Sequence, residues 1–348
     1  MKAIIKNINI TSISSYLPET VFELSSLSKE FGEKVVANII RATGIERIRI
    51  ADKDETSSDM CFKAAEYLLR NECVERKDVD GLVFVSQTSD YLVPSTSVIL
   101  QDRLGLSKDT VCIDIHYGCS GYIYGLFQAC LWINSGACTN VLVLSGDTST
   151  KMINPKDKSL RMVFGDCGTA TLLKKGADDI GFNINSDGGG YDRLIIPAGG
   201  FRIRSSDVTK ILEFDEDGNG RTQEDLYMDG MAIFDFSISN VHKNIDSLIE
   251  FVNWDKESIN LFVLHQANKF MINTIRKKMK VEETRVPMNL TNYGNTGPAT
   301  IPLLLSDLYS SNSNVLDRVI LSGFGVGLSW GSIACNLTKT KLYKPINK

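Results

Sequence analysis

The sequence predicts an α/β protein in which short apolar strands alternate with helices. Five short segments are rich in Val, Ile and Leu, as strands are when helices cover both faces of their sheet. Helical patterns lie between these segments, and each half of the chain has a strand that runs into a glycine-containing elbow. The predicted strands are residues 81–86, 111–115, 140–145, 260–264 and 318–322.

Three helices are predicted from the spacing of apolar residues. The helix over 58–70 follows Ser and Thr residues that are candidate caps. The segment 121–133 is apolar almost all round, so we expect a buried helix. The helix over 270–279 carries apolar residues on one face and basic residues on the other. The residues expected to face the core from the first helix are Met60, Ala64, Ala65, Leu68 and Leu69.

A chain of 348 residues is too long for one small core. The elbows at 117–121 and 323–327 place one similar unit in each half, so we expect two packed halves, residues 1–175 and 176–348. No Pro/Gly/Ser-rich linker separates them. The polar, acidic segment 209–224 is expected to form a surface loop.

The composition excludes several classes of protein. Hydrophobic residues make up 43% and charged residues 23%, as in ordinary globular enzymes. The formal charge of −4 gives no bulk basic signal for nucleic acid. No apolar run approaches the roughly 20 residues that span a bilayer. The first residues alternate like a strand and lack a signal-peptide core, so we expect a cytoplasmic protein.

The eight cysteines show no CxxC or other metal-ligand spacing, so no metal site is expected. Most lie in apolar runs, as buried thiols do in a reducing compartment. Cys119 stands out because Tyr117-Gly-Cys-Ser-Gly121 joins a predicted strand to the buried helix. The helix N-terminus is expected to lower the pKa of this thiol and to offer N–H groups to an oxyanion. Taken alone, the motif fits a structural cysteine equally well.

Two further motifs supply polar side chains. His265 follows the strand 260–264 in His265-Gln-Ala-Asn268, at the strand end where α/β sheets bind ligands. Asn295 lies in a glycine-rich turn that precedes a helix opened by Pro298. A neutral imidazole and a carboxamide can both hydrogen-bond one carbonyl oxygen. Each motif alone also fits a structural role, as a buried histidine or as a turn.

The last glycine-rich motif, residues 322–331, allows the backbone to approach a ligand closely. It lacks the strand, turn and helix of a GxGxxG motif with an acidic residue further on, so dinucleotide binding is not expected. Close packing of two strands is the alternative explanation.

Together, in this order and spacing, these motifs resemble the β-ketoacyl-acyl carrier protein synthase III family of thiolase-fold condensing enzymes. The resemblance covers nearly the whole chain and implies a thiolase-like fold, with two similar βαβ-rich halves in a five-layered αβαβα arrangement. It rests on Thr43-Gly-Ile45, Val93-Pro-Ser95, Gly118-Cys-Ser-Gly121, Phe164-Gly-Asp166, His265-Gln-Ala-Asn268, Tyr293-Gly-Asn-Thr296 and Phe324-Gly-Val-Gly-Leu-Ser-Trp-Gly331.

The resemblance implies a ping-pong Claisen condensation with Cys119, His265 and Asn295 as the catalytic triad. Cys119 takes an acyl group from an acyl thioester. A malonyl thioester, expected as malonyl-acyl carrier protein, then loses carbon dioxide while His265 and Asn295 bind its thioester oxygen. The enolate attacks the acyl group, and the backbone N–H groups of Cys119 and Val326 form the oxyanion hole.

Two related reactions are disfavoured by single positions. The hydroxymethylglutaryl synthases that the chain resembles carry a Glu where this sequence has Thr88, and thiolases carry a second cysteine in the last glycine motif, which here has none. An acyltransferase on the same fold, which moves an acyl group to an alcohol or amine without condensation, is the alternative function. A non-catalytic partner subunit is a third hypothesis, although it would be expected to have lost Cys119 or His265.

The positions that the family uses for coenzyme A are altered. A stacking Trp and an Arg before Thr43-Gly-Ile45 are matched by Asn38 and Ala42, with Arg41 one residue early. A second family Arg is matched by Lys158, while Asn268 keeps its place in the histidine motif. Coenzyme A or phosphopantetheine thioesters are expected as substrates with no further cofactor, and a carrier-bound or unusual primer is favoured over acetyl-CoA.

The resemblance also implies two protein partners. Val93 matches a position that lines the acyl pocket of the second subunit, so a homodimer is expected, and a Val here favours a longer or branched primer. A basic run beside His265 is expected to bind the acidic acyl carrier protein, although a solvated helix face is the alternative. Its residues are Lys269, Arg276, Lys277 and Lys278.

Overall fold

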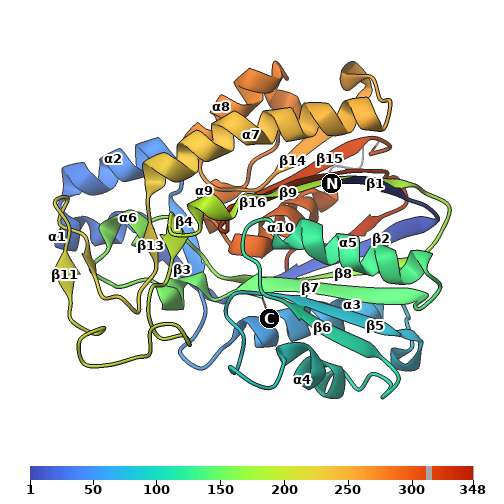
Figure 1. Cartoon of the computed structure of the whole chain (residues 1–348), viewed down its shortest axis with the longest axis horizontal. Helices are drawn as coiled ribbons and strands as arrows, with labels where there is room; N and C mark the ends of the chain where they lie inside the picture. The colour runs from blue at the N-terminus through green and yellow to red at the C-terminus, as the bar shows by residue number, and fades with distance from the viewer. Residues whose placement is uncertain (311–315, 348) are drawn as a thin grey trace.

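The computed structural model describes residues 1–310 and 316–347, which form five layers in the order αβαβα (Figure 1). Two sheets enclose a central helical layer, and further helices cover the outer face of each sheet. This arrangement confirms the predicted fold class. Extra elements extend the molecule at the side where β3, β11 and β13 lie (Figure 1).

The first sheet has the order β17-β2-β8-β7-β5-β6. β5 pairs in parallel with both β6 and β7, so that Val83 lies between Ile113 and Val143. The strands are β2 (Ile8–Tyr16), β5 (Gly81–Val85), β6 (Val111–Ile115), β7 (Asn140–Asp147), β8 (Cys167–Lys175) and β17 (Lys341–Leu342).

The second sheet has the order β1-β9-β16-β15-β14, in which β14 and β15 are parallel. Its strands are β1 (Lys2–Ile5), β9 (Ile180–Ser186), β14 (Leu261–Leu264), β15 (Val319–Gly325) and β16 (Ser329–Cys335). The N-terminal β1 therefore joins the second sheet, while the C-terminal β17 joins the first. The division into halves at residues 175 and 176 stays a prediction.

The central layer contains α5 (Gly121–Asn134) and α10 (Thr300–Asp307), which pack against strands of both sheets. α7 (Gly230–Phe251) covers the second sheet and packs against α8 (Lys269–Met279), whereas α3 (Ser57–Asn71) and α4 (Thr96–Arg103) cover the first. Thr56 caps α3 through a capping box with Asp59. Every core-facing residue predicted for this helix is buried.

The remaining elements are short. The strands are β3 (Thr20–Glu23), β4 (Arg47–Ile50), β10 (Leu194–Ile195), β11 (Glu213–Phe214), β12 (Gly220–Arg221) and β13 (Tyr227–Met228). The helices are α1 (Ser28–Phe31), α2 (Glu33–Thr43), α6 (Lys158–Arg161) and α9 (Leu290–Tyr293). The 3-10 helices are η1 (Leu24–Leu27), η2 (Arg76–Asp78), η3 (Ser149–Met152), η4 (Gly188–Gly190), η5 (Lys256–Ser258), η6 (Glu283–Arg285), η7 (Gly297–Ala299) and η8 (Leu308–Ser310).

Each of the predicted strands and helices is present, but one was wrongly expected to be buried. β6 is the last strand of its sheet, and Val111 and Ile113 are exposed. Apolar content alone does not distinguish such an edge strand from a central one.

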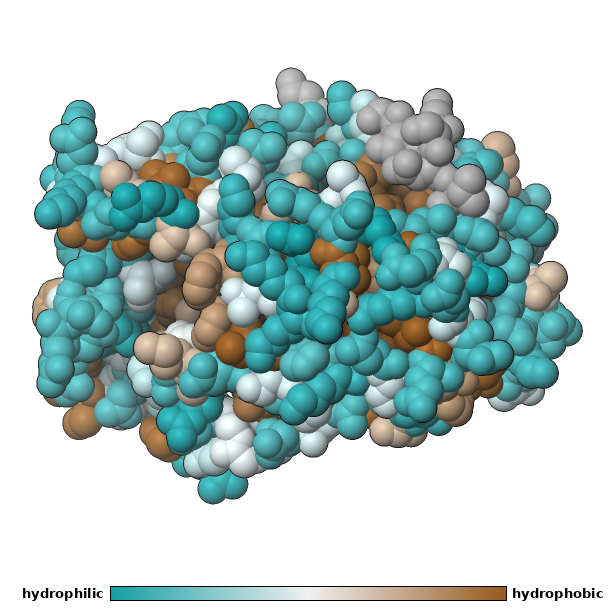
Figure 2. All heavy atoms as spheres, turned by 90° about the horizontal axis from the view of Figure 1, so that it is seen from above, coloured by the Kyte–Doolittle hydropathy of each residue, from teal (hydrophilic) through white to brown (hydrophobic). Residues whose placement is uncertain are grey.

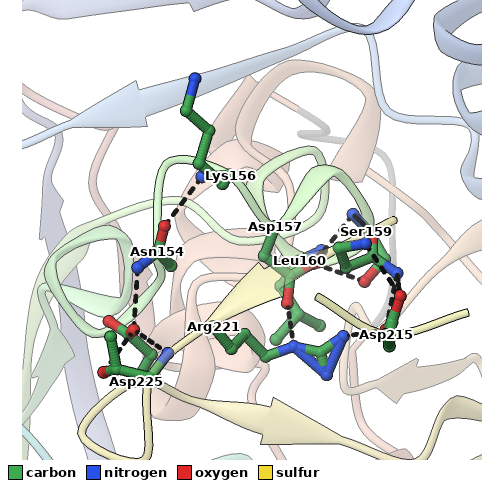
Figure 3. A network of polar contacts seen from close by, with 10 residues as sticks. Asn154, Lys156, Asp157, Ser159, Leu160, Asp215, Arg221 and Asp225 are labelled. Atoms are coloured by element: carbon green, nitrogen blue, oxygen red, sulfur yellow. Dashed lines mark hydrogen bonds and ion pairs between the residues drawn. The ribbon is translucent and has the colours of Figure 1, made fainter. Parts of the chain in front are cut away.

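The predicted surface loop at 209–224 is also more ordered than expected. It contains the β11–β12 hairpin, which a polar network holds against α6 (Figure 3). Arg221 pairs with the buried carboxylate of Asp157 at 2.9 Å and also with Asp215. Asp215 in turn accepts hydrogen bonds from Asn219.

Across residues 1–310 and 316–347, we find no helix with the length and apolar character needed to cross a membrane.

Candidate active site

Cys119 lies immediately before α5, in an elbow that glycines allow to pack tightly. A Cβ on Gly121 would lie 2.5 Å from Val85 of β5, and one on Gly323 would lie 2.9 Å from the carbonyl oxygen of Cys119. The first turn of α5 is therefore held between β5 and β15. The Ser120 hydroxyl also lies 2.6 Å from that of Ser329, so the elbow is tied to β16.

The electrostatic environment of Cys119 differs from the prediction. Burial, followed by the charge of Asp147, raises the pKa of its thiol to about 12. The backbone N–H groups of Cys119 and Val326 and the amide of Asn295 act in the opposite direction. The structure therefore does not support the expected low pKa, because the loss of hydration outweighs these hydrogen-bond donors. Both N–H groups predicted for the oxyanion hole are nevertheless near enough to the sulfur to lower its pKa.

His265 follows β14 and is almost fully buried. Its Nδ1 lies 2.7 Å from the hydroxyl of Thr300, and its ring packs edge-on against Phe324. Burial lowers the pKa of this imidazole to about 3, so His265 is neutral at physiological pH. A neutral ring can donate one hydrogen bond to a substrate oxygen without adding a charge to the site.

Asn295 is held by its own backbone and by the turn that follows it. Its N–H donates to the carbonyl of Val163 at 2.8 Å, and its carbonyl accepts from the N–H of Gly165 at 3.0 Å. Its side-chain oxygen accepts from the N–H of Gly297 at 3.0 Å. This bond orients the carboxamide and leaves its NH₂ group available as a donor.

Cys119, His265 and Asn295 line one cavity of about 390 Å³, which we call the apolar cavity. The structure thus brings together the three residues predicted from separate motifs. The other residues that line the cavity are Val163, Phe164, Leu194, Met228, Gly230, Met231, Ile233, Phe234, Ser237, Ala267, Asn268, Phe270, Met271, Phe324 and Gly325.

Exposed apolar side chains surround the apolar cavity on the face formed by α7 and α8. Figure 2 looks onto this face and shows hydrophobic residues in a hollow within a mostly hydrophilic surface. Met231 is 73% exposed and Phe270 is 61% exposed, and Phe270 stacks on Phe234. These residues could not be predicted from the sequence, because exposed apolar positions on an amphipathic helix carry no recognisable pattern.

A second cavity of about 310 Å³ also reaches Cys119. We call it the polar cavity after Gln87, Asp147 and Ser149, although half of its lining residues are apolar. His265 and Asn295 do not line it. The sulfur of Cys119 therefore lies where the apolar cavity and the polar cavity meet. The residues around the polar cavity are Gln87, His116, Cys119, Asp147, Ser149, Met152, Phe164, Tyr191, Leu194, Ile195, Ile196, Leu226, Gly297 and Val326.

The predicted coenzyme A contacts are only partly assembled. Asn268 lines the apolar cavity and also caps α8 through the N–H of Met271. Arg41 lies on the surface of α2, where it donates to Asn38 at 3.0 Å, and it lines neither cavity. The ammonium group of Lys158 donates to the carbonyl of Asp217 and likewise lines neither cavity.

The predicted partner-binding residues lie on the surface, with one exception. Val93 is 81% exposed in the loop before α4. Lys269, Lys277 and Lys278 are exposed on α8, whose first turn borders the apolar cavity. Arg276 instead donates to the carbonyl of Val281 at 3.1 Å, beyond the end of its own helix.

Family models match two parts of the chain. Residues 113–188 match 3-oxoacyl-(acyl-carrier-protein) synthase III, and residues 249–337 match the C-terminal part of the same family. The first region contains Cys119, and the second contains His265, Asn295 and Val326.

Whole-chain relatives agree with these matches. The chain is 34% identical to a putative 3-oxoacyl-(acyl-carrier-protein) synthase 3 of Campylobacter jejuni, over 87% of this chain and 85% of that one. It is 32% identical to a β-ketoacyl-(acyl-carrier-protein) synthase III of Clostridium perfringens, over 95% and 100% of the two chains.

Solved structures show the same likeness. A 3-oxoacyl-(acyl-carrier-protein) synthase of Burkholderia xenovorans superposes with a TM-score of 0.92 and 34% identity, over 100% of this chain and 99% of that one. A 3-oxoacyl-(acyl-carrier-protein) synthase III superposes with a TM-score of 0.91 and 37% identity, over 95% and 99% of the two chains. The chain therefore belongs to the 3-oxoacyl-(acyl-carrier-protein) synthase III family of acyl-transferring condensing enzymes.

Proposed function

We propose that this enzyme joins an acyl group to a malonyl unit by a two-step, decarboxylating condensation. The observation that carries the proposal is the position of Cys119 between two cavities, only one of which contains His265 and Asn295. An acyl group on the sulfur can occupy the polar cavity while a second thioester enters the apolar cavity. Such a separation suits a ping-pong reaction in which the first product leaves before the second substrate binds.

In the first step, the sulfur of Cys119 attacks the carbonyl carbon of an acyl thioester. The carbonyl oxygen becomes an oxyanion, which the N–H groups of Cys119 and Val326 stabilise. The tetrahedral intermediate expels the donor thiolate, which takes the proton of the Cys119 thiol. The raised pKa of this thiol is compatible with the step, because the proton leaves with the first product.

In the second step, the malonyl thioester oxygen accepts hydrogen bonds from His265 and Asn295. The bond to the carboxylate carbon breaks, carbon dioxide leaves, and the electron pair forms an enolate whose charge lies on that oxygen. Two neutral donors in a buried site are well suited to this charge. The enolate carbon attacks the acyl carbonyl, and the Cys119 thiolate that is expelled takes up a proton.

Thr300 determines which nitrogen of His265 can serve as the donor. We propose that the Thr300 hydroxyl donates to Nδ1 across the 2.7 Å contact, which keeps the ring proton on Nε2. The single proton of this hydroxyl can otherwise be donated to the carbonyl of Gly297 at 3.1 Å, and we assign it to Nδ1 because that contact is shorter. Thr300 is therefore a positioning residue that acts through His265.

The malonyl donor is proposed to be malonyl-acyl carrier protein. Lys269, Lys277 and Lys278 are exposed on the surface of α8, whose first turn borders the apolar cavity, and positive charge on this helix suits an acidic carrier. Arg276 is excluded from this surface by its bond to Val281. The reaction itself needs no cofactor beyond the thioester carriers, and a cytoplasmic location remains a prediction.

We propose that two copies of the chain pair along β6. This strand is an unpaired edge of the first sheet, and Val111 and Ile113 are exposed on it. An exposed apolar edge strand is a ready template for a partner strand. Leu92 and Val93, in the loop before α4, are about 80% exposed and would be covered by the same contact.

Single substitutions should separate the two chemical steps. We expect Cys119→Ala to abolish acyl-enzyme formation, which intact-protein mass spectrometry reports. His265→Ala and Asn295→Ala should still form the acyl-enzyme but release carbon dioxide from labelled malonyl-acyl carrier protein about 100-fold more slowly, since each removes a donor to the enolate oxygen.

Cys73→Ala and His242→Ala are matched controls, because neither residue lines either cavity. Loss of acylation in both the His265 and Asn295 variants would contradict the assigned roles. Acyl transfer to an alcohol or amine without carbon dioxide release would instead identify an acyltransferase.

Substitution of Thr300 tests the proposed tautomer. Thr300→Val removes the hydroxyl at nearly constant shape, so we expect decarboxylation to slow by about tenfold while acylation of Cys119 is retained. Thr300→Ser should restore most of the rate because it restores the hydroxyl. Equal rates for the Val and Ser variants would show that the hydroxyl does not orient His265.

The molecular mass of the enzyme in solution tests the proposed dimer. Sedimentation equilibrium should give twice the 38.5 kDa chain mass for the native enzyme. Ile113→Lys places a charge on the β6 edge and should shift the equilibrium toward the single chain, whereas Ile4→Lys, on an exposed position of β1, should not. A native enzyme of single-chain mass at micromolar concentration would rule out the proposed pairing.

A further inference from the structure

Asp147 presents an unused carboxylate oxygen beside Cys119. The residue ends β7 and is only 1% exposed. Its Oδ1 accepts all four of its hydrogen bonds, from the Ser86 hydroxyl, the Gln87 N–H, and the N–H and hydroxyl of Thr88. Oδ2 accepts none from the described part of the chain, and Asp147 lines the polar cavity.

Gly297 leaves Oδ2 uncovered. It has a φ of +60°, and a Cβ at this position would lie 2.8 Å from Oδ2. Glycine thus lets the backbone pass close to the carboxylate without placing a side chain between it and the cavity. Burial raises the pKa of Asp147 to about 6, so most molecules carry the charged form above neutral pH.

Other polar groups around the same cavity also lack partners. Ser149 is 2% exposed, and its hydroxyl makes no hydrogen bond to any described residue. The same holds for the side-chain amide of Gln87, which lies close to Gly118 in the Cys119 elbow. His116 and Tyr191 add an imidazole and a phenol to the lining, and both are exposed.

Half of the residues that line this cavity are apolar, but a plain alkyl chain would leave its polar groups without hydrogen-bond partners. It would cover Asp147 Oδ2 and the Ser149 hydroxyl without offering either a hydrogen bond, and buried polar groups without partners cost free energy. An acyl group that carries a hydroxyl or amino group could donate a hydrogen bond to Asp147 Oδ2 or to the Ser149 hydroxyl. Asp147 is not placed to act on the malonyl unit, because His265 and Asn295 line the other cavity.

We propose that the acyl group carried by Cys119 bears a hydroxyl or amino substituent, and that Asp147 and Ser149 select it. The inference rests on the proposed function, because it assumes that Cys119 is the acyl carrier. It names the chemical class of the first substrate, a short acyl chain with a hydrogen-bond donor, and two specificity-determining residues.

The test compares matched acyl donors on the full-length enzyme. Butyryl, 3-hydroxybutyryl, 4-hydroxybutyryl and 3-aminobutyryl thioesters of N-acetylcysteamine are presented separately, and the rate of Cys119 acylation is followed by intact mass. We expect at least one substituted donor to react about tenfold or more faster than butyryl, as for a hydrogen bond to a charged group. Comparison of the hydroxybutyryl donors with the aminobutyryl donor identifies which substituent the site binds.

Two variants assign the preference to residues. Asp147→Asn should bring the ratio of substituted to butyryl rates to within about threefold, and Ser149→Ala should lower it by about threefold. Should Asp147→Asn fail to fold, Ser149→Ala alone tests the inference. Its folding should be unaffected, because the Ser149 hydroxyl makes no hydrogen bond to any described residue. Cys73→Ala, which lies outside both cavities, should leave the ratio unchanged.

The possible failures can be told apart. Butyryl acylation as fast as that of every substituted donor would overturn the inference while the proposed function stands. A preference that survives both Asp147→Asn and Ser149→Ala would also overturn it. Absence of Cys119 acylation by all four donors and by the corresponding coenzyme A and acyl carrier protein thioesters would reject the proposed function, and with it this inference.

Discussion

The tight packing of the first turn of α5 between the two sheets is the constraint on which the site depends. Gly121 lets this turn contact β5, and Gly323 lets β15 contact the backbone of Cys119. The contact brings the sulfur from the first half of the chain close to Val326, the proposed oxyanion donor, and to His265 and Asn295 from the second half. It also places Cys119 between two cavities, which is the geometric basis for handling two acyl groups in turn.

Burial gives the site its chemical character. The same loss of hydration raises the pKa of Cys119 and lowers that of His265, so both groups rest uncharged. In the proposed reaction, charge develops on substrate oxygens that bind the N–H groups of Cys119 and Val326 or the side chains of His265 and Asn295. Such preorganised donors stabilise a transition state more than a solvated ground state. Asp147 is the exception, because its charge lies on the side of the cavity that we assign to the acyl group.

Much of the fold and of the catalytic centre could be predicted from the sequence. Apolar periodicity located the strands and helices, and three local motifs contained Cys119, His265 and Asn295. The polar cavity could not be predicted, because Gln87, His116, Asp147, Ser149 and Tyr191 come from separate segments and belong to no shared motif. The edge position of β6, the internal bond of Arg276 and the net pKa of Cys119 depend on tertiary packing, which local patterns do not encode.

A crystal structure of the enzyme acylated at Cys119 would test this account most directly. The account predicts that the acyl chain lies in the polar cavity and that its carbonyl oxygen lies about 3 Å from the backbone nitrogens of Cys119 and Val326. The apolar cavity should remain free for the malonyl thioester. An acyl chain that fills the apolar cavity, or a carbonyl oxygen that faces His265 and Asn295, would contradict the division of roles between the two cavities.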